Sequence, residues 1–219
     1  YIEGGVPEGR AFKRHSMYAL EPPTDLIELT VFAAFSEVYL AKEGHNGLVG
    51  INLLEKIVLP NLPSLYGPIL ADVDYVIMGA GIPLEIPGAL DALAQHQPFA
   101  LRVPVAGAVK GVEHKIHFDP ADILATPAAP AKRPIFLAII SSNVLATAFR
   151  KRANGRVDGF VVEAPTAGGH NAPPRGPLQL NDRGEPVYGP KDEVNLAELA
   201  AHGMPFWLAG SYASPERLQ

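Results

Sequence analysis

The 219-residue chain is long enough for one domain with a substantial core, since 47% of its residues are hydrophobic. Its net charge of −5 and its scattered Lys and Arg residues argue against a nucleic-acid partner. No apolar run approaches the roughly 18 residues of a membrane-spanning helix, which argues against a membrane partner. The absence of cysteine excludes disulfide and thiolate chemistry, and because no signal-peptide pattern opens the sequence we expect a cytoplasmic protein.

The two ends of the sequence do not resemble complete termini. Residue 1 is Tyr rather than Met, and residues 1–23, rich in Gly, Pro and charge, predict an extension or loop. The last letters, SPERLQ, have Ser214 as an N-cap and Pro215 at the first position of a helix that does not follow. We therefore expect an internal part of a longer protein.

From residue 24 to residue 219 the sequence predicts one α/β domain. The segment DLIELTVFAAFSEVYLAKEG has its apolar residues spaced for a helix with one broad buried face. Thr24 is the expected N-cap of this helix and Gly44 its C-terminal cap.

Two apolar runs then predict buried strands, each followed by a helix. The first strand is LVGINLL (48–54), with a helix beginning near Ser64. The second is VDYVIMG (73–79), with a helix over about 88–96.

Residues 99–134 interrupt this alternation and predict an insertion. ALRVPVAGAV and HKIHFD have the pattern of two short strands, which we expect to form a hairpin, and DILATPAAPAKRP has the composition of a linker.

The alternation resumes after residue 134 with the strand IFLAIISS (135–142), the helix NVLATAFRKRANG, the strand DGFVVEAP, a loop to Pro190, the helix NLAELAAHG and the strand PFWLAGS (205–211). Apolar strands that alternate with helices predict a parallel sheet covered on both faces, either an α/β barrel or a doubly wound sheet.

Polar residues and glycines near the ends of the predicted strands favour the barrel. A TIM barrel builds its active site from the carboxyl ends of its strands, whereas a doubly wound sheet gathers its ligand at one switch point. Here such residues follow all five strands: Asn52, Gly79 to Gly81, Ser141, Ser142, the segment from Glu163 to His170, Gly210 and Ser211. Because a complete barrel has eight strands in about 250 residues, we expect three strands to lie outside this sequence.

The last predicted strand ends in LAGSYASPERL, a candidate phosphate-binding turn. Gly210 followed by a helical start leaves backbone N–H groups free to receive an anion. An equally acceptable interpretation is that Gly210 only allows a tight turn.

The segment PTAGGHNAPPRG contains the strongest candidate for a catalytic residue. Gly168 and Gly169 permit close approach of a ligand, and the proline pair at 173–174 fixes the direction in which the chain leaves. His170 between them can act as a base or as a hydrogen-bond donor near neutral pH, although a histidine that caps its own loop is the alternative. A metal site is disfavoured because the other histidines are dispersed: His15, His45, His96, His114, His117 and His202.

Four motifs together, GINL, VIMGAGIP, DGFVVEAPTAGGHNAPPRG and PFWLAGSYASPERL, resemble the nitronate monooxygenase family, formerly called 2-nitropropane dioxygenases, whose relatives include FMN-dependent enoyl-ACP reductases. The resemblance covers nearly all of residues 24–219. It implies an FMN-binding TIM barrel of which this chain carries the third to seventh strands. It also implies oxidation of alkyl nitronates or nitroalkanes by O2 to a carbonyl compound and nitrite.

The resemblance further implies roles for single residues. His170 matches the active-site histidine of the family, and the matches to flavin-contacting positions are Asn52, Glu163, Gly168, Gly169, Gly210 and Ser211. The letters APT at 164–166, the APPRG tail and the insertion depart from the family pattern and point to a subgroup with a different substrate.

Two other functions stay open at this point. An NAD(P)H-dependent FMN reductase acting on an enoyl thioester or quinone would have the same fold and needs no GxGxxG fingerprint, which this sequence lacks. A non-catalytic binding subunit is the alternative from a different class. The oligomeric state is also open, a homodimer included.

Overall fold

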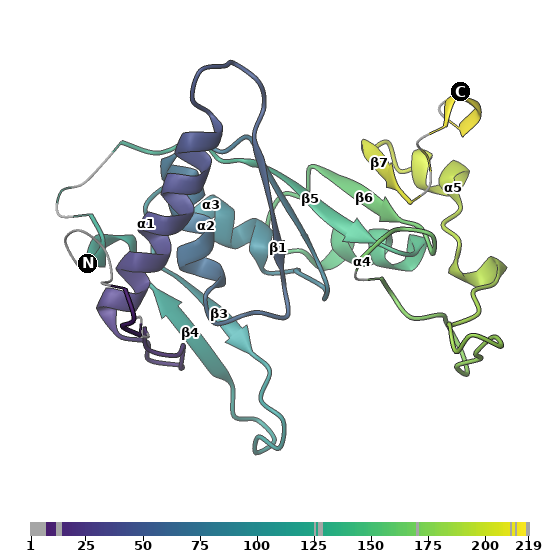
Figure 1. Ribbon diagram of the computed structural model, residues 1–219, viewed down its shortest axis with the longest axis horizontal. Coiled ribbons are helices and arrows are strands. Elements are labelled where there is room, and N and C mark those ends of the chain that lie inside the picture. Colours follow the sequence, from purple (N-terminus) through teal and green to yellow (C-terminus); the bar gives the residue numbers. More distant parts are fainter. Residues whose placement is uncertain are drawn as a thin grey trace.

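The computed structural model describes residues 8–11, 15–124, 126, 129–169, 171–210, 212 and 214–217 (Figure 1). Its elements in chain order are α1 (Thr24–Ala41), β1 (Gly50–Leu54), α2 (Asn61–Leu70), β2 (Tyr75–Gly79), α3 (Ile86–Ala94), β3 (Phe99–Val103), β4 (His114–Phe118), β5 (Ile135–Ile140), α4 (Asn143–Arg152), β6 (Gly159–Glu163), α5 (Leu196–Ala200) and β7 (Phe206–Ala209). Short 3₁₀ turns cover Pro120–Asp122, Pro190–Asp192 and Pro215–Arg217.

Five strands form one parallel sheet in the order β1-β2-β5-β6-β7. Each of these strands was expected from an apolar run, and their parallel pairing confirms an α/β fold. The spatial order follows the chain order and never reverses, whereas a doubly wound sheet reverses its order at the switch point. The sheet is therefore compatible with part of an α/β barrel.

The insertion over 99–134 contains the expected hairpin. Strands β3 and β4 pair antiparallel in a sheet of their own, so they do not disturb the pairing of β2 with β5. The hairpin projects from the main sheet in Figure 1. Its inner side chains Leu101, Ile116 and Phe118 are buried and join the main core.

Helix α1 differs from its prediction in two respects. Pro23, not Thr24, occupies the N-cap position, and no side chain caps the helix there; at the other end Lys42 is the C-cap and Gly44 follows with φ +76°. The helix also lacks the broad buried face that its spacing predicts, because Leu26, Val31 and Val38 are buried but the following are exposed: Leu29, Phe32, Tyr39 and Leu40. Within the part of the chain that the structure describes, neither this helix nor another is long and apolar enough to cross a bilayer.

The two faces of the main sheet have different surroundings. Side chains of one face, such as Val76, Phe136 and Phe160, pack with residues of α2 to α5 in one core cluster. On the opposite face, Leu54, Ile135 and Trp207 stay 41%, 37% and 47% exposed. The prediction that the sheet is covered on both faces is therefore not met by the described residues, because every second side chain along each strand lies on a face that no helix covers.

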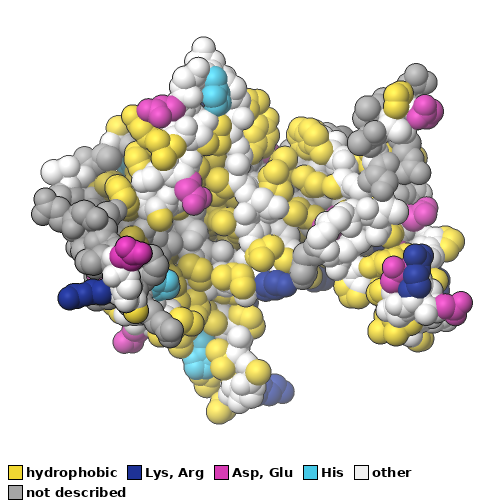
Figure 2. All heavy atoms as spheres, in the orientation of Figure 1, with side chains coloured by type: hydrophobic (Ala, Val, Ile, Leu, Met, Phe, Trp, Pro, Cys, Tyr) yellow, Lys and Arg dark blue, Asp and Glu magenta, His cyan; other side chains and the backbone are white. Residues whose placement is uncertain are grey.

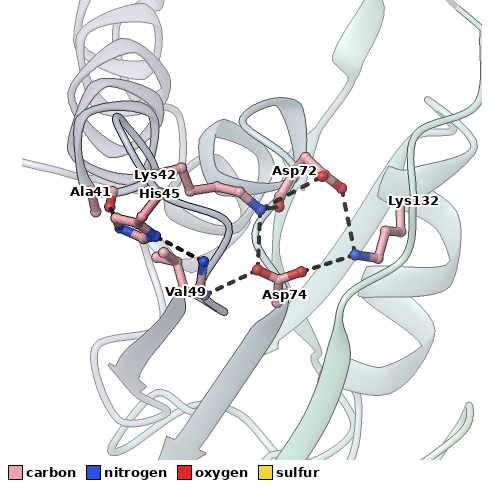
Figure 3. Close-up of polar contacts among 8 residues, drawn as sticks. Ala41, Lys42, His45, Val49, Asp72, Asp74 and Lys132 are labelled. Atoms are coloured by element: carbon pink, nitrogen blue, oxygen red, sulfur yellow. Dashed lines mark hydrogen bonds and ion pairs between the residues drawn. The ribbon is translucent and has the colours of Figure 1, made fainter.

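A buried carboxylate joins the amino-terminal ends of β1, β2 and β5 (Figure 3). Asp74 Oδ2 accepts a hydrogen bond from the Val49 N–H at 3.0 Å and lies 3.1 Å from Lys42 Nζ, while its Oδ1 lies 2.9 Å from Lys132 Nζ. The Asp74 side chain is only 10% exposed. The Val49 hydrogen bond and the two lysines hold the pKa of Asp74 well below its ordinary value.

A second carboxylate repeats this arrangement one strand pair further along the sheet. Asp158 Oδ2 accepts a hydrogen bond from the Phe136 N–H at 2.8 Å and pairs with Arg133 Nη1 at 2.7 Å. Arg133 also pairs with Asp91 of α3. Neighbouring residues 132 and 133 thus tie β5 to the strand on each side of it.

We expect Asp74→Asn to destabilise the fold by about 2 kcal/mol at pH 7, because two lysines lose their buried partner. Since the pKa of Asp74 is lowered in the folded state, its stabilisation is complete above the unfolded value near 3.8 and is lost as the pH falls. The difference in the free energy of unfolding between Asp74→Asn and wild type, measured by urea unfolding, should therefore become smaller below about pH 4. Asp72→Asn is the matched control, because the Asp72 side chain is 61% exposed and pairs with the same lysines at 3.6 and 3.8 Å.

Candidate functional site

The carboxyl ends of β6 and β7 lie side by side and carry most of the predicted site residues. Glu163 is the last residue of β6 and has Ala209 as its partner in β7. The next residue, Ala164, donates its N–H to the Ala209 carbonyl at 2.9 Å. Because β7 ends at Ala209, Gly210 leaves the sheet directly beside the loop that begins at Ala164.

Asn171 fixes the loop that carries the glycine and histidine motif. Its Nδ2 donates to the Pro165 carbonyl at 2.8 Å and to the Ala164 carbonyl at 3.3 Å. The loop therefore closes on its own first residues, as compact surface loops do. His170 lies outside the described residues, so its catalytic role stays a prediction.

The three described glycines of the site have different surroundings. Gly168 and Gly169 are exposed, and nothing lies within 4 Å of the place where a Cβ would be, although Gly169 has φ +79°. At Gly210, with φ +113°, a Cβ would lie 2.8 Å from the backbone nitrogen of Ala167. This close contact with the β6 loop is a packing reason for glycine at position 210, and it applies with or without a phosphate at this turn.

Arg175 and Asp192 hold the chain that follows the motif. Asp192 accepts hydrogen bonds from the backbone N–H groups of Gly189 and Arg175, at 2.8 and 2.7 Å. These two bonds lower the pKa of the Asp192 carboxyl. The Arg175 guanidinium donates to the Ser141 carbonyl at the end of β5, at 3.2 Å. No sequence pattern predicted a role for either residue, although Arg175 stands within the PPRG letters next to the motif.

A cavity of about 740 Å³ lies between the loops after β6 and β7. Its volume is in the range of small-molecule sites, about 300–1,000 Å³. Its lining includes Thr166, Gly210 and Tyr212, and also Tyr188, whose hydroxyl donates to the Ala172 carbonyl at 2.9 Å. Glu193 is its acidic lining residue, and neither Lys nor Arg is among the described residues that line it. The cavity thus offers neutral donors rather than fixed positive charge.

Asn52 does not join this group. It is the third residue of the five in β1, not the strand-end residue that the sequence predicted, and its partner in β2 is Ile77. Strands β2 and β5 separate it from β6, a distance of about 14 Å at the usual strand spacing. Its side chain lies on the sheet face without helices, in the alternate position to Ile51 and Leu53, which pack toward the core.

Comparison of the chain with models of known protein families, with curated proteins and with solved structures gives no match. The structure brings Glu163, Gly168, Gly169 and Gly210 to the neighbouring ends of β6 and β7, and leaves Asn52 elsewhere on the sheet. Ser211, like His170, lies outside the described residues.

We expect Gly210→Ala to lower the free energy of unfolding by about 2 kcal/mol, because alanine is strained at φ +113° and its Cβ would meet the Ala167 backbone. Gly168→Ala, in open space at an ordinary φ, should change it by less than about 1 kcal/mol. Thermal and urea unfolding measure both. Equal stabilities of the two variants would refute the packing explanation of Gly210.

Proposed function

We propose that this chain is the third-to-seventh-strand portion of an FMN-dependent TIM-barrel oxidoreductase of the nitronate monooxygenase type. The observation that carries the proposal is the position of the loop that begins the AGG segment (167–169): Ala167 lies against Gly210, which follows β7, and Thr166 and Gly210 line a ligand-sized cavity. The unreversed strand order supports the barrel part of the proposal, since barrels place such loops around one mouth.

The cavity beside Gly210, of about 740 Å³, is large enough for FMN, and the residues around it are of types that can donate hydrogen bonds to FMN. Gly210, Ser211 and the Thr166 hydroxyl would hold the phosphate, by backbone N–H and hydroxyl donors. Glu163, Gly168 and Gly169 would hold the ring end, whereas Asn52, three strands away in β1, lies outside this arrangement. When bound, FMN would supply the electron-transfer chemistry.

In this proposal His170 acts on a nitroalkane or nitronate. As a base it would remove the α-proton of a nitroalkane, and as a donor it would hold the nitro oxygens of a nitronate. Asn171 and Arg175 would act as positioning residues, because they fix the chain on the carboxyl side of His170 to the ends of β6 and β5. O2 is the second substrate, and a carbonyl compound and nitrite are the products.

Purification and FMN titration test the proposal. A yellow protein that absorbs at about 450 nm, or one that takes up added FMN, supports the proposal that the chain is a flavoprotein. O2 consumption with propyl nitronate in the absence of NADPH then separates the monooxygenase from an FMN reductase, which would oxidise NADPH. A colourless protein that binds no added FMN contradicts the proposal.

We expect His170→Ala to keep FMN and to lower kcat with propyl nitronate by about 10²- to 10⁴-fold, the usual contribution of a general acid or base. His117→Ala is the control and should keep wild-type kcat, since His117 is exposed on β4 of the separate hairpin. Stopped-flow turnover and the flavin spectrum measure both variants. Wild-type turnover in His170→Ala would remove this histidine from the mechanism.

A further inference from the structure

A second cavity, here called the hairpin cavity, lies where the β3–β4 hairpin meets the carboxyl ends of β1 and β2. Its volume is about 470 Å³, and it shares no described lining residue with the cavity beside Gly210. Three segments line it: residues 55–61 after β1, residues 82–86 after β2, and residues 101–114 of the hairpin. Nothing in the proposed flavin site accounts for it.

Part of the lining of the hairpin cavity, called here the apolar wall, consists of hydrophobic side chains that are open to solvent. Ile82, Val105 and Val112 line it and stay 50%, 44% and 52% exposed. Figure 2 shows hydrophobic side chains along the projecting hairpin. Exposed apolar side chains that face a concavity gain free energy when a ligand covers them, so this wall suits an aliphatic group.

Other lining residues of this cavity carry charges, and most of these charges compensate one another. Arg102 meets Glu85 twice, through Nε at 2.9 Å and through its backbone N–H at 3.2 Å. Glu113 pairs with Lys115 at 3.1 Å. Cations of the hairpin therefore already neutralise these two carboxylates.

Glu55 is the exception. Among the described residues no cation and no hydrogen-bond donor pairs with its carboxylate, although Asn61 anchors its backbone by donating to the Glu55 carbonyl at 3.2 Å. Its Oε2 packs over Gly81, in the space that a Cβ at residue 81 would fill. Burial, and then the charge of Glu85, raise the pKa of Glu55. A cation beside Glu55 would offset both effects.

We propose that the hairpin cavity binds an amphipathic organic cation, an alkylammonium group whose nitrogen pairs with Glu55 and whose chain lies against Ile82, Val105 and Val112. A metal ion is a poorer occupant, because no group of three or more His, Asp or Glu side chains in the described part of the chain could hold one. The apolar wall also favours a ligand with a hydrocarbon part.

Calorimetry and methyl NMR of the wild-type protein test this proposal with three probes: hexylammonium, hexanol and hexanoate. At pH 7.5 hexylammonium is charged, as lysine is. We expect it to bind at least about tenfold more tightly than hexanol or hexanoate, because a charge-assisted hydrogen bond contributes roughly 1.5–3 kcal/mol. The methyl signals of Ile82, Val105 and Val112 should shift on binding. Equal binding of hexanol, tighter binding of hexanoate, or no shift at these methyl groups would overturn the proposal.

Glu55→Gln tests the anchor. This variant keeps the shape of the side chain and should weaken hexylammonium binding by at least about tenfold, with the hexanol affinity unchanged. Glu113→Gln is the matched control, because Glu113 is 58% exposed and already paired with Lys115. The affinity of this variant for hexylammonium should stay within about twofold of wild type. If Glu55→Gln binds hexylammonium as tightly as wild type does, or if Glu113→Gln loses as much hexylammonium affinity as Glu55→Gln, then Glu55 is not the anchor.

Discussion

The register of the main sheet depends on two carboxylates and two neighbouring cations at the amino-terminal ends of its strands. Asp74 accepts the backbone N–H of Val49, just before β1, and Asp158 accepts that of Phe136 in β5. Lys132, just before β5, pairs with Asp74, and its neighbour Arg133 pairs with Asp158. A slip of one residue in β5 would break both pairs and would turn Phe136 out of the core. These four side chains therefore hold β5 between β2 and β6.

Because the amino-terminal ends are fixed in this way, the carboxyl ends can carry loops of varied length. Asn171 helps to close the loop after β6, and Arg175 with Asp192 directs the chain beyond it. In barrel proteins stability and function are commonly divided between the two ends of the strands in this manner. Both cavities discussed above lie at the carboxyl end.

The hairpin shows how an insertion adds a binding surface without altering the sheet. Its buried side, which includes Phe118 packed against Tyr66 with ring centroids 5.4 Å apart, anchors it to the core. Its other side leaves Val105 and Val112 exposed beside Glu55. Since β3 and β4 satisfy their own backbone hydrogen bonds, β2 and β5 remain neighbours in the main sheet.

The sequence by itself determined all five parallel strands, the helices between them and the hairpin, because apolar runs, glycines and prolines act over a few residues. It placed Glu163 correctly at the end of β6. Only the tertiary structure decided that Asn52 lies in mid-strand, that Ala167 crowds Gly210, and that Glu55 lacks a partner among the described residues. These facts depend on contacts between segments distant in the chain, as does the Asp74–Lys132 pair across 58 residues. Local patterns carry no information about such contacts.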